Sequence, residues 1–158
     1  MKNYIVLVCG IVVILLVGAM WYAKGRMKSE AIYTNTTYGY SVHYPKSLLL
    51  DAKDPKVVTL GVVSFEPGPG ALFMSVDEGE ILPASAELQD QTESICQEMV
   101  LAGAPAVRCA GSEGFAGGST TSYMVQLGKN LLSFYYIHGD TSSDNRMEAI
   151  ISSLEIQK

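Results

Sequence analysis

The most continuous run of hydrophobic positions lies near the start of the chain, at residues 4–23 (YIVLVCGIVVILLVGAMWYA), and contains no Asp, Glu, Lys or Arg. As a helix, these twenty residues extend about 30 Å, which is the thickness of the hydrocarbon core of a bilayer. The run ends at the bulky Trp21 and Tyr22 and is longer than the apolar part of a typical cleaved signal peptide. We therefore expect an uncleaved single-pass anchor, in which residues 4–23 contact the lipid bilayer.

Beyond residue 30 the hydrophobic positions recur at the spacing of β-strands. In the stretch 40–44 (YSVHY), apolar residues alternate with Ser41 and His43, as they do in a half-buried strand, and Pro45 ends the run. Further strands are predicted at residues 57–65, 71–76, 106–111, 120–127 and 131–138. Turns rich in glycine and proline are expected at 66–70 and 112–119.

Two stretches have helical spacing instead. Residues 85–103 place Leu88, Thr92, Ile95, Cys96 and Met99 on one stripe, with acids and glutamines on the opposite face. Gly103 and Pro105 then supply a stop, so the pattern predicts one amphipathic helix. A second helix is expected from about Asp144, with a stripe of Met147, Ile150, Ile151 and Leu154. The last five residues are expected to fray or to form an edge strand.

The segment 38–45 (YGYSVHYP) resembles the first strand of PsbP-like domains, the αβα sandwich shared with Mog1 and with several anchored bacterial proteins. Leu72, Ser75 and Val76 are similar to the strand pair that follows in that family, and residues 147–156 (MEAIISSLEI) are similar to its final helix and strand. An aromatic residue that is common in the family soon after the proline is replaced here by leucines. The resemblance implies an α+β domain, with a PsbP-like αβα sandwich built on a central, mostly antiparallel sheet.

Together these patterns predict three parts of the chain. Residues 1–28 form a membrane anchor with a basic flank, residues 29–37 form a short tether, and residues 38–158 form the PsbP-like globular domain. The tether is short, so we expect the domain to lie close to the bilayer surface.

Charge is distributed unevenly between these parts. Residues 29–158 hold seven of the eleven Lys and Arg residues and all sixteen acids, which gives a net charge of about −9. Phosphates would be repelled by such a surface, so we expect no nucleic-acid partner. The charges that flank the apolar run bear on its orientation: Lys24, Arg26 and Lys28 follow it, and only the Lys2 side chain precedes it. The positive-inside tendency alone would put the domain in the cytoplasm, whereas the short N-terminal tail is typical of an anchor whose N-terminus is cytoplasmic.

The sequence contains no recognisable catalytic set. His43 and His138, the two histidines, lie on predicted strands outside any metal-binding or CxxC-type motif, and no G-x-S-x-G turn is present. The densest acidic cluster, Asp77, Glu78 and Glu80, contains oxygen ligands of the kind that calcium prefers, but it lacks the spacing of an EF-hand loop. Some PsbP-like domains have metal sites, but none of those ligands can be matched to residues here, so we expect no cofactor.

Cys96 and Cys109 are the only cysteines outside the apolar run. Both are predicted to point inward, and the turn between them would let their Cα atoms approach the separation of about 4.4–6.8 Å that a disulfide needs. Two separate buried thiols are the alternative, because free cysteine is a common core residue. A disulfide would indicate an oxidising compartment, and hence an exported domain with a cytoplasmic N-terminus.

Two functions remain open at this point. The absence of a catalytic set and the family resemblance favour a non-catalytic, membrane-tethered accessory domain that contacts another membrane or envelope protein from the extracytoplasmic side. The alternative is an enzyme, or a receptor for a small ligand or metal, with a pocket formed by Tyr135, His138 and the acids of residues 77–80.

Overall fold

The computed structural model describes residues 30–61, 69–92, 94–111 and 119–157. Within these ranges no helix is long and apolar enough to cross a bilayer. The predicted anchor at residues 4–23 lies outside the described residues, and so does most of each turn expected at 66–70 and 112–119.

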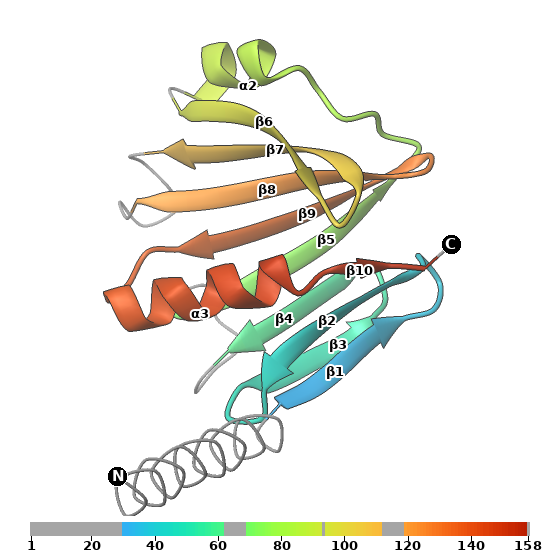
Figure 1. The fold of residues 1–158 in the computed structure, drawn as a ribbon, viewed down its shortest axis with the longest axis vertical. Helices are drawn as coiled ribbons and strands as arrows, with labels where there is room; N and C mark the ends of the chain where they lie inside the picture. The colour runs from blue at the N-terminus through green and yellow to red at the C-terminus, as the bar shows by residue number, and fades with distance from the viewer. Residues whose placement is uncertain (1–29, 62–68, 93, 112–118, 158) are drawn as a thin grey trace, which may run out of the picture.

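Seven antiparallel strands form the main sheet. Figure 1 shows the sheet with α3 packed across it. Their order across the sheet is β3 (Leu49–Asp54), β4 (Val57–Gly61), β5 (Leu72–Glu78), β9 (Asn130–Ile137), β8 (Thr120–Leu127), β7 (Ala104–Gly111) and β6 (Ile95–Leu101). A smaller antiparallel sheet has the order β1 (Glu30–Asn35), β2 (Tyr40–Pro45) and β10 (Glu155–Ile156). The two helices are α2 (Ser85–Thr92) and α3 (Thr141–Ser152). The expected α+β class and antiparallel sheet are confirmed.

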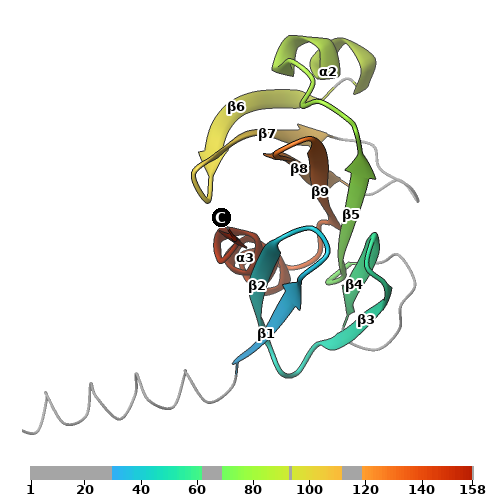
Figure 2. The ribbon, with the colours of Figure 1, turned by 90° about the vertical axis from the view of Figure 1, so that its right-hand side faces the viewer.

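The main sheet curves strongly, with α3 and the small sheet on its concave side and α2 on the outside beside β6 (Figure 2). One core fills the space between the main sheet, α3 and β2. Its largest fully buried side chains include Tyr40, Leu60, Leu72, Met74, Leu132, Phe134, Tyr136, Met147, Ile150 and Ile151. A second, smaller cluster lies under α2 and contains Cys96, Val107 and Cys109 with Leu82, Leu88 and Met124 around them.

The strand predicted at residues 40–44 is confirmed as β2. Tyr40 and Val42 are buried in the core, and Tyr44 packs against it. Gly39, which precedes the strand, has a φ of +71°, a left-handed conformation that suits glycine because it has no Cβ. Its N–H donates to the carbonyl of Asn35 and thereby closes the turn between β1 and β2.

The single helix predicted at 85–103 is wrong. Only Ser85–Thr92 are helical, and Ile95–Leu101 form β6. Ala102 and Gly103 both have positive φ, which a two-residue hairpin turn requires, so β6 pairs directly with β7. Cys96 and Met99 fit a helical stripe by their spacing alone. The segment forms a strand because its backbone hydrogen-bonds to β7, and the local spacing carries no information about that neighbour.

Two further strands were not predicted. Most of the expected tether forms β1, whose residues from Glu30 to Asn35 pair with β2. The leucines after Pro45 lead into β3, which pairs with β4 through a register shift between Asp51 and Asp54. Residues 30–35, which the sequence assigned to the tether, are therefore part of the folded domain, and the described domain contains β1 and β3 in addition to the predicted strands.

Side chains on β1 join the small sheet to the rest of the domain. Tyr33 packs against the core and lies edge-on to Tyr40, with 6.1 Å between ring centroids. Asn35 is buried, and its side-chain amide donates to the carbonyl of Pro55, between β3 and β4, at 2.7 Å. Strand β1 is thus an integral part of the fold.

We expect a fragment of residues 29–158 to fold, and a fragment that begins at residue 38 to be less stable by at least about 3 kcal/mol. The shorter fragment loses the buried contacts of Tyr33 and the hydrogen bonds of Asn35. Urea denaturation of both fragments, followed by circular dichroism, measures the difference. Equal midpoints would show that residues 30–35 act only as a tether.

Candidate functional site

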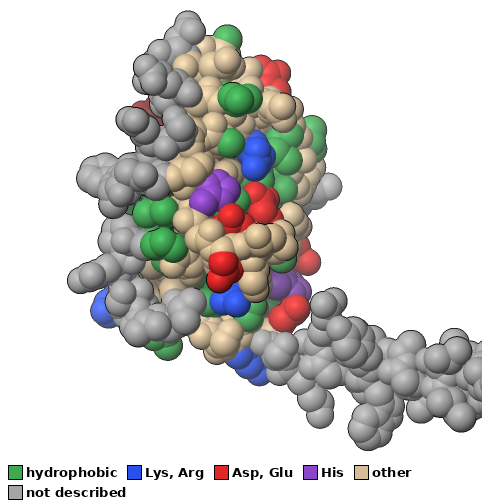
Figure 3. Space-filling view, turned by 90° about the vertical axis from the view of Figure 1, so that its left-hand side faces the viewer, with side chains coloured by type: hydrophobic (Ala, Val, Ile, Leu, Met, Phe, Trp, Pro, Cys, Tyr) green, Lys and Arg blue, Asp and Glu red, His purple; other side chains and the backbone are tan. Residues whose placement is uncertain are grey.

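A continuous set of polar side chains lies where α3 meets the concave face of strands β7, β8 and β9. We call it the Glu148–His138 network, and its members are Arg108, Thr121, Tyr123, Tyr136, His138, Asp144 and Glu148. Figure 3 shows a histidine in contact with acidic side chains on the face where α3 begins. The members of the Glu148–His138 network make up the candidate site.

The register of the strands brings the members together. Arg108 lies opposite Tyr123 on β7 and β8, and Thr121 lies opposite Tyr136 on β8 and β9. Directly opposed residues in an antiparallel pair point to the same face. Helix α3 follows β9 after a short turn and carries Asp144 and Glu148, which are four residues apart and therefore share one helix face.

Glu148 accepts two short hydrogen bonds from tyrosines. The hydroxyl of Tyr123 donates to Oε2 at 2.5 Å, and the hydroxyl of Tyr136 donates to Oε1 at 2.6 Å. Arg108 donates through Nε to the Tyr123 oxygen at 2.8 Å, and its Nη2 lies 3.7 Å from the Glu148 carboxylate. The guanidinium also lies 5.6 Å from the centroid of the Tyr123 ring.

Burial and the Glu148 charge keep both tyrosines protonated. Burial and the hydrogen bond to the Glu148 carboxylate together raise the pKa of Tyr123 to about 12, and Arg108 opposes the shift. The pKa of Tyr136 is raised for the same two reasons. Burial would lower the pKa of Arg108, but its contacts with Tyr123 and Glu148 outweigh this effect and raise it. The tyrosines are therefore hydrogen-bond donors at neutral pH.

His138 connects α3 to β8. Its Nδ1 lies 2.8 Å from Oδ2 of Asp144, and its Nε2 lies 2.9 Å from the hydroxyl of Thr121. Burial would raise the pKa of Asp144, but the Gly139 N–H and His138 outweigh it and hold that pKa below its usual value. The His138 ring also packs edge-on against Tyr136, with 5.1 Å between centroids.

A hydroxyl, a histidine and an aspartate in this order have the connectivity of a catalytic triad. Thr121, however, is fully buried, at 0% exposure. A substrate carbonyl has no access to a hydroxyl that is covered on all sides, and the hydroxyl already bonds to the histidine. In this structure the three residues attach the start of α3 to the sheet.

The pocket suggested by the sequence is not assembled. Tyr135 lies on the convex face beside Phe73, whereas Tyr136 and His138 face the concave side. Leu72 pairs with Tyr136, and Glu78 pairs with Asn130, so the acidic cluster and His138 lie at opposite ends of the β5–β9 pair. Eight residue steps along the strand separate Asn130 from His138, which corresponds to about 26 Å.

The acids of residues 77–80 also do not converge. Asp77 and Glu78 are adjacent on β5 and therefore point to opposite faces. Glu78 accepts from Lys56 at 3.0 Å and from Tyr38 at 2.8 Å, contacts that lower its pKa, and it lines a surface depression of 490 Å³. Among the described residues there is no group of three His, Cys, Asp or Glu side chains placed to hold a metal.

His43 occupies a different place from His138. Its ring nitrogens lie 4.0 Å from Glu30 and 3.9 Å from Glu155, across the outer face of the small sheet. It lines a groove of 180 Å³ between β2 and α3 together with Arg146 and Ser153. The two histidines are therefore not parts of one site.

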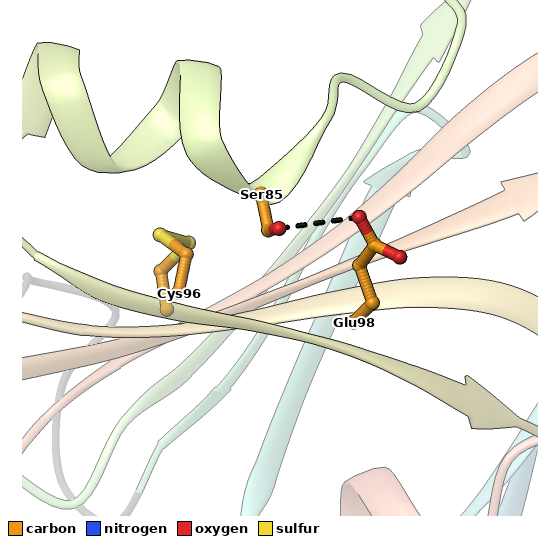
Figure 4. Close-up of a disulfide and its surroundings, with 4 residues drawn as sticks. Ser85, Cys96 and Glu98 are labelled. Carbon is orange, nitrogen blue, oxygen red and sulfur yellow. Dashed lines mark hydrogen bonds between the residues drawn. A yellow bond between two sulfur atoms is a disulfide. The ribbon is translucent and has the colours of Figure 1, made fainter.

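Cys96 and Cys109 form a disulfide, as Figure 4 shows, with 4.1 Å between their Cα atoms. The bond joins directly opposed residues of β6 and β7, rather than a helix and a strand as the sequence suggested. Its side chains point toward α2 and pack with Leu82 and Leu88. Near it the hydroxyl of Ser85 on α2 donates to Glu98 at 3.2 Å.

Sequence reasoning missed most of the Glu148–His138 network. It named His138 but not Arg108, Tyr123, Tyr136 or Glu148, because these residues belong to no motif. The sequence held only a weak signal for this network. Arg108 and Tyr123 are polar or charged side chains at inward-facing positions of two predicted strands, where apolar residues are expected.

Comparisons with known proteins support the fold. No family model matches the chain, and no curated protein matches it. The solution structure of cyanobacterial PsbP (CyanoP) from Synechocystis sp. PCC 6803 aligns with a TM-score of 0.54 and 12% identity, over 81% of this chain and 92% of that one. A crystal structure from Bacteroides thetaiotaomicron VPI-5482 aligns with a TM-score of 0.50 and 15% identity, over 82% of this chain but only 48% of that one. The described domain therefore has a PsbP-like fold.

Substitution of Glu148 by Gln should lower the pKa of Tyr123 from about 12 toward the ordinary value of 10.0, because the carboxylate charge that disfavours tyrosinate is removed. Burial remains, so the value should stay above 10.0. NMR titration of ring-labelled tyrosine measures each ring, and Glu87→Gln on α2 is the control.

The raised pKa of Tyr123 also predicts that the stability of the domain depends on pH. Tyr123 holds its proton more tightly in the folded state than in the unfolded chain, so its contribution to stability is complete below pH 10 and is lost as the pH rises past about 12. An unchanged Tyr123 titration in Glu148→Gln would contradict the described contact.

Proposed function

Because the domain has a PsbP-like fold and the polar groups of its candidate site bond to one another, we propose that this protein is a membrane-tethered, non-catalytic accessory domain that binds another membrane or envelope protein. The observation that carries the proposal is the burial of Thr121, which leaves the triad-like arrangement without an accessible nucleophile. The hydrogen bonds of the Glu148–His138 network then hold α3 on the sheet. The exposed surface of the domain binds the partner protein.

Tethering rests on the apolar run at residues 4–23 and on the position of β1. Strand β1 begins at Glu30, so six residues separate it from the end of the predicted anchor. Six extended residues reach about 20 Å, which would hold the domain near the bilayer. A partner in or near the same membrane would then meet it at high effective concentration.

The disulfide supports an extracytoplasmic location. Disulfides persist in oxidising compartments and are rare in the cytosol. A bond that closes the Cys96–Cys109 loop, with a sequence separation of 13, contributes roughly 3 kcal/mol by the loop-entropy account. That is a large fraction of the stability of a small domain.

Thiol labelling of the full-length protein in its native membrane tests the location. Under denaturing, non-reducing conditions only Cys9 should react, and all three cysteines should react after reduction. A Cys9→Ser variant should give no signal before reduction. Labelling of Cys96 and Cys109 without reductant would instead place the domain in the cytoplasm, with Lys24, Arg26 and Lys28 as the guide to orientation.

Crosslinking tests the binding function. A photoreactive residue at exposed Ile32, Ile81 or Val100 should form an adduct with the same membrane or envelope protein from at least one position. The adduct should be lost when residues 1–28 are deleted and should be kept in His138→Gln, because that histidine has no catalytic role in this proposal. Adducts with lipid alone would overturn the binding function, and loss of the adduct in a stably folded His138→Gln variant would favour the enzyme.

A further inference from the structure

Strand β6 is an open edge of the main sheet. It pairs with β7 on one side, and no described strand lies on its other side (Figures 1 and 2). An open edge exposes a row of backbone donors and acceptors, to which another extended chain can pair.

The register identifies these groups. In an antiparallel pair, opposed residues with Cα atoms about 4.5 Å apart are those that do not exchange hydrogen bonds. Cys96 and Cys109, at 4.1 Å, are such a pair, and so is Val100 with Pro105, which has no N–H to donate. The backbone N–H and C=O groups of Cys96, Glu98 and Val100 therefore point away from β7, and they have no hydrogen-bond partner among the described residues.

The opposite edge of the same sheet is protected against pairing. Strand β3 has a register shift between Asp51 and Asp54, and it carries Lys53, which forms a 3.5 Å ion pair with Asp51. Bulges and charged side chains are the usual means of blocking an edge. Strand β6 has neither a register shift nor a cation, and its one charged residue is Glu98.

The β6 edge is also held rigid. The disulfide fixes it to β7, the turn at Ala102 and Gly103 ends it, and α2 packs over its convex face through the cluster that contains Leu82 and Leu88. A strand that is ordered before binding loses less conformational entropy when a partner pairs with it.

The exposed side chains of β6 indicate the chemistry of the partner. Ile95 is 68% exposed on the concave face, and Val100 is 70% exposed on the convex face. Glu98 is exposed, and the hydroxyl of Ser85, its hydrogen-bond donor, does not neutralise its charge. A second copy of β6 fits poorly, because the antiparallel register with the longest overlap places Glu98 opposite Glu98.

We propose that β6 is a docking edge for an extended segment of another protein, which adds as an eighth strand and carries apolar residues and a lysine or arginine beside Glu98. This inference rests on the proposed binding function and names the surface of the domain that performs it. Strand alternation sets the pattern of the segment: apolar side chains on the concave side, next to Ile95 and Met99, and cations on the convex side.

The test uses the full-length protein in phosphatidylcholine nanodiscs and three nine-residue peptides. The first alternates valine and lysine, the second has the same sequence with alternate backbone amides methylated, and the third has glutamate in place of lysine. Fluorescence anisotropy should show saturable binding of the first peptide, with each of the others bound at least about tenfold more weakly, as the loss of one or two hydrogen bonds or of charge complementarity predicts.

Two matched variants locate the binding. Val100→Lys places a cation at the edge and should weaken binding of the valine–lysine peptide at least about tenfold. Ile32→Lys makes the same kind of change on β1, where the side chain is 60% exposed, and should leave the affinity within about twofold. Circular dichroism melts check that both variants fold.

Four results would overturn the proposal: no saturable binding of the valine–lysine peptide, equal binding of the methylated peptide, equal binding to Val100→Lys, or self-association through β6 that Val100→Lys abolishes. If the peptide result is negative but crosslinking still captures a protein partner, the accessory function stands and only the docking edge fails. If the peptide binds but no partner is captured in the membrane, the edge stands and the accessory function fails.

Discussion

The packing of α3 against the concave face of the main sheet is the contact on which the rest of the domain depends. Met147, Ile150 and Ile151 are almost fully buried there, and Asp140 caps the helix by accepting from the N–H of Ser143. The helix also leads into β10, which pairs with β2 and so attaches the small sheet. Without α3 the concave face and the small sheet would both lose their main cover.

Burial of α3 has a polar consequence as well. Its apolar stripe fixes the helix in one rotation, and that rotation directs Asp144 and Glu148 at His138, Tyr123 and Tyr136. Unsatisfied polar groups would be costly at this depth, and among the described residues no buried side-chain nitrogen or oxygen lacks a partner. No buried side-chain nitrogen or oxygen of the described interior is therefore left free to bind a further group. Backbone groups without a partner among the described residues lie instead along the outer edge of β6.

The errors of the sequence-based interpretation have a common cause. Residues 95–101 were assigned to a helix because their apolar positions fit both periods over a short stretch, and pairing with β7 decided between them. Residues 30–35 were assigned to a tether because their polar and apolar residues give no strong pattern, although β2 supplies a complete set of partners. Strand β3 was missed for a similar reason, since LLDAKD alternates poorly and lies at an edge.

The sequence by itself determined the elements whose hydrophobic pattern is clear: β2, β4, β5, β7, β8, β9, α3 and a membrane-length apolar run, together with the resemblance to PsbP-like domains. The sequence also indicated Cys96 and Cys109 as a disulfide pair, but it placed Cys96 on a helix, whereas the residue lies on β6. Tertiary structure alone decided which residues are neighbours across strands. The disulfide, the Glu148–His138 network and the open edge of β6 all follow from register and strand order. Local hydrophobic periodicity records which way a side chain points, but it does not record which strand lies beside it.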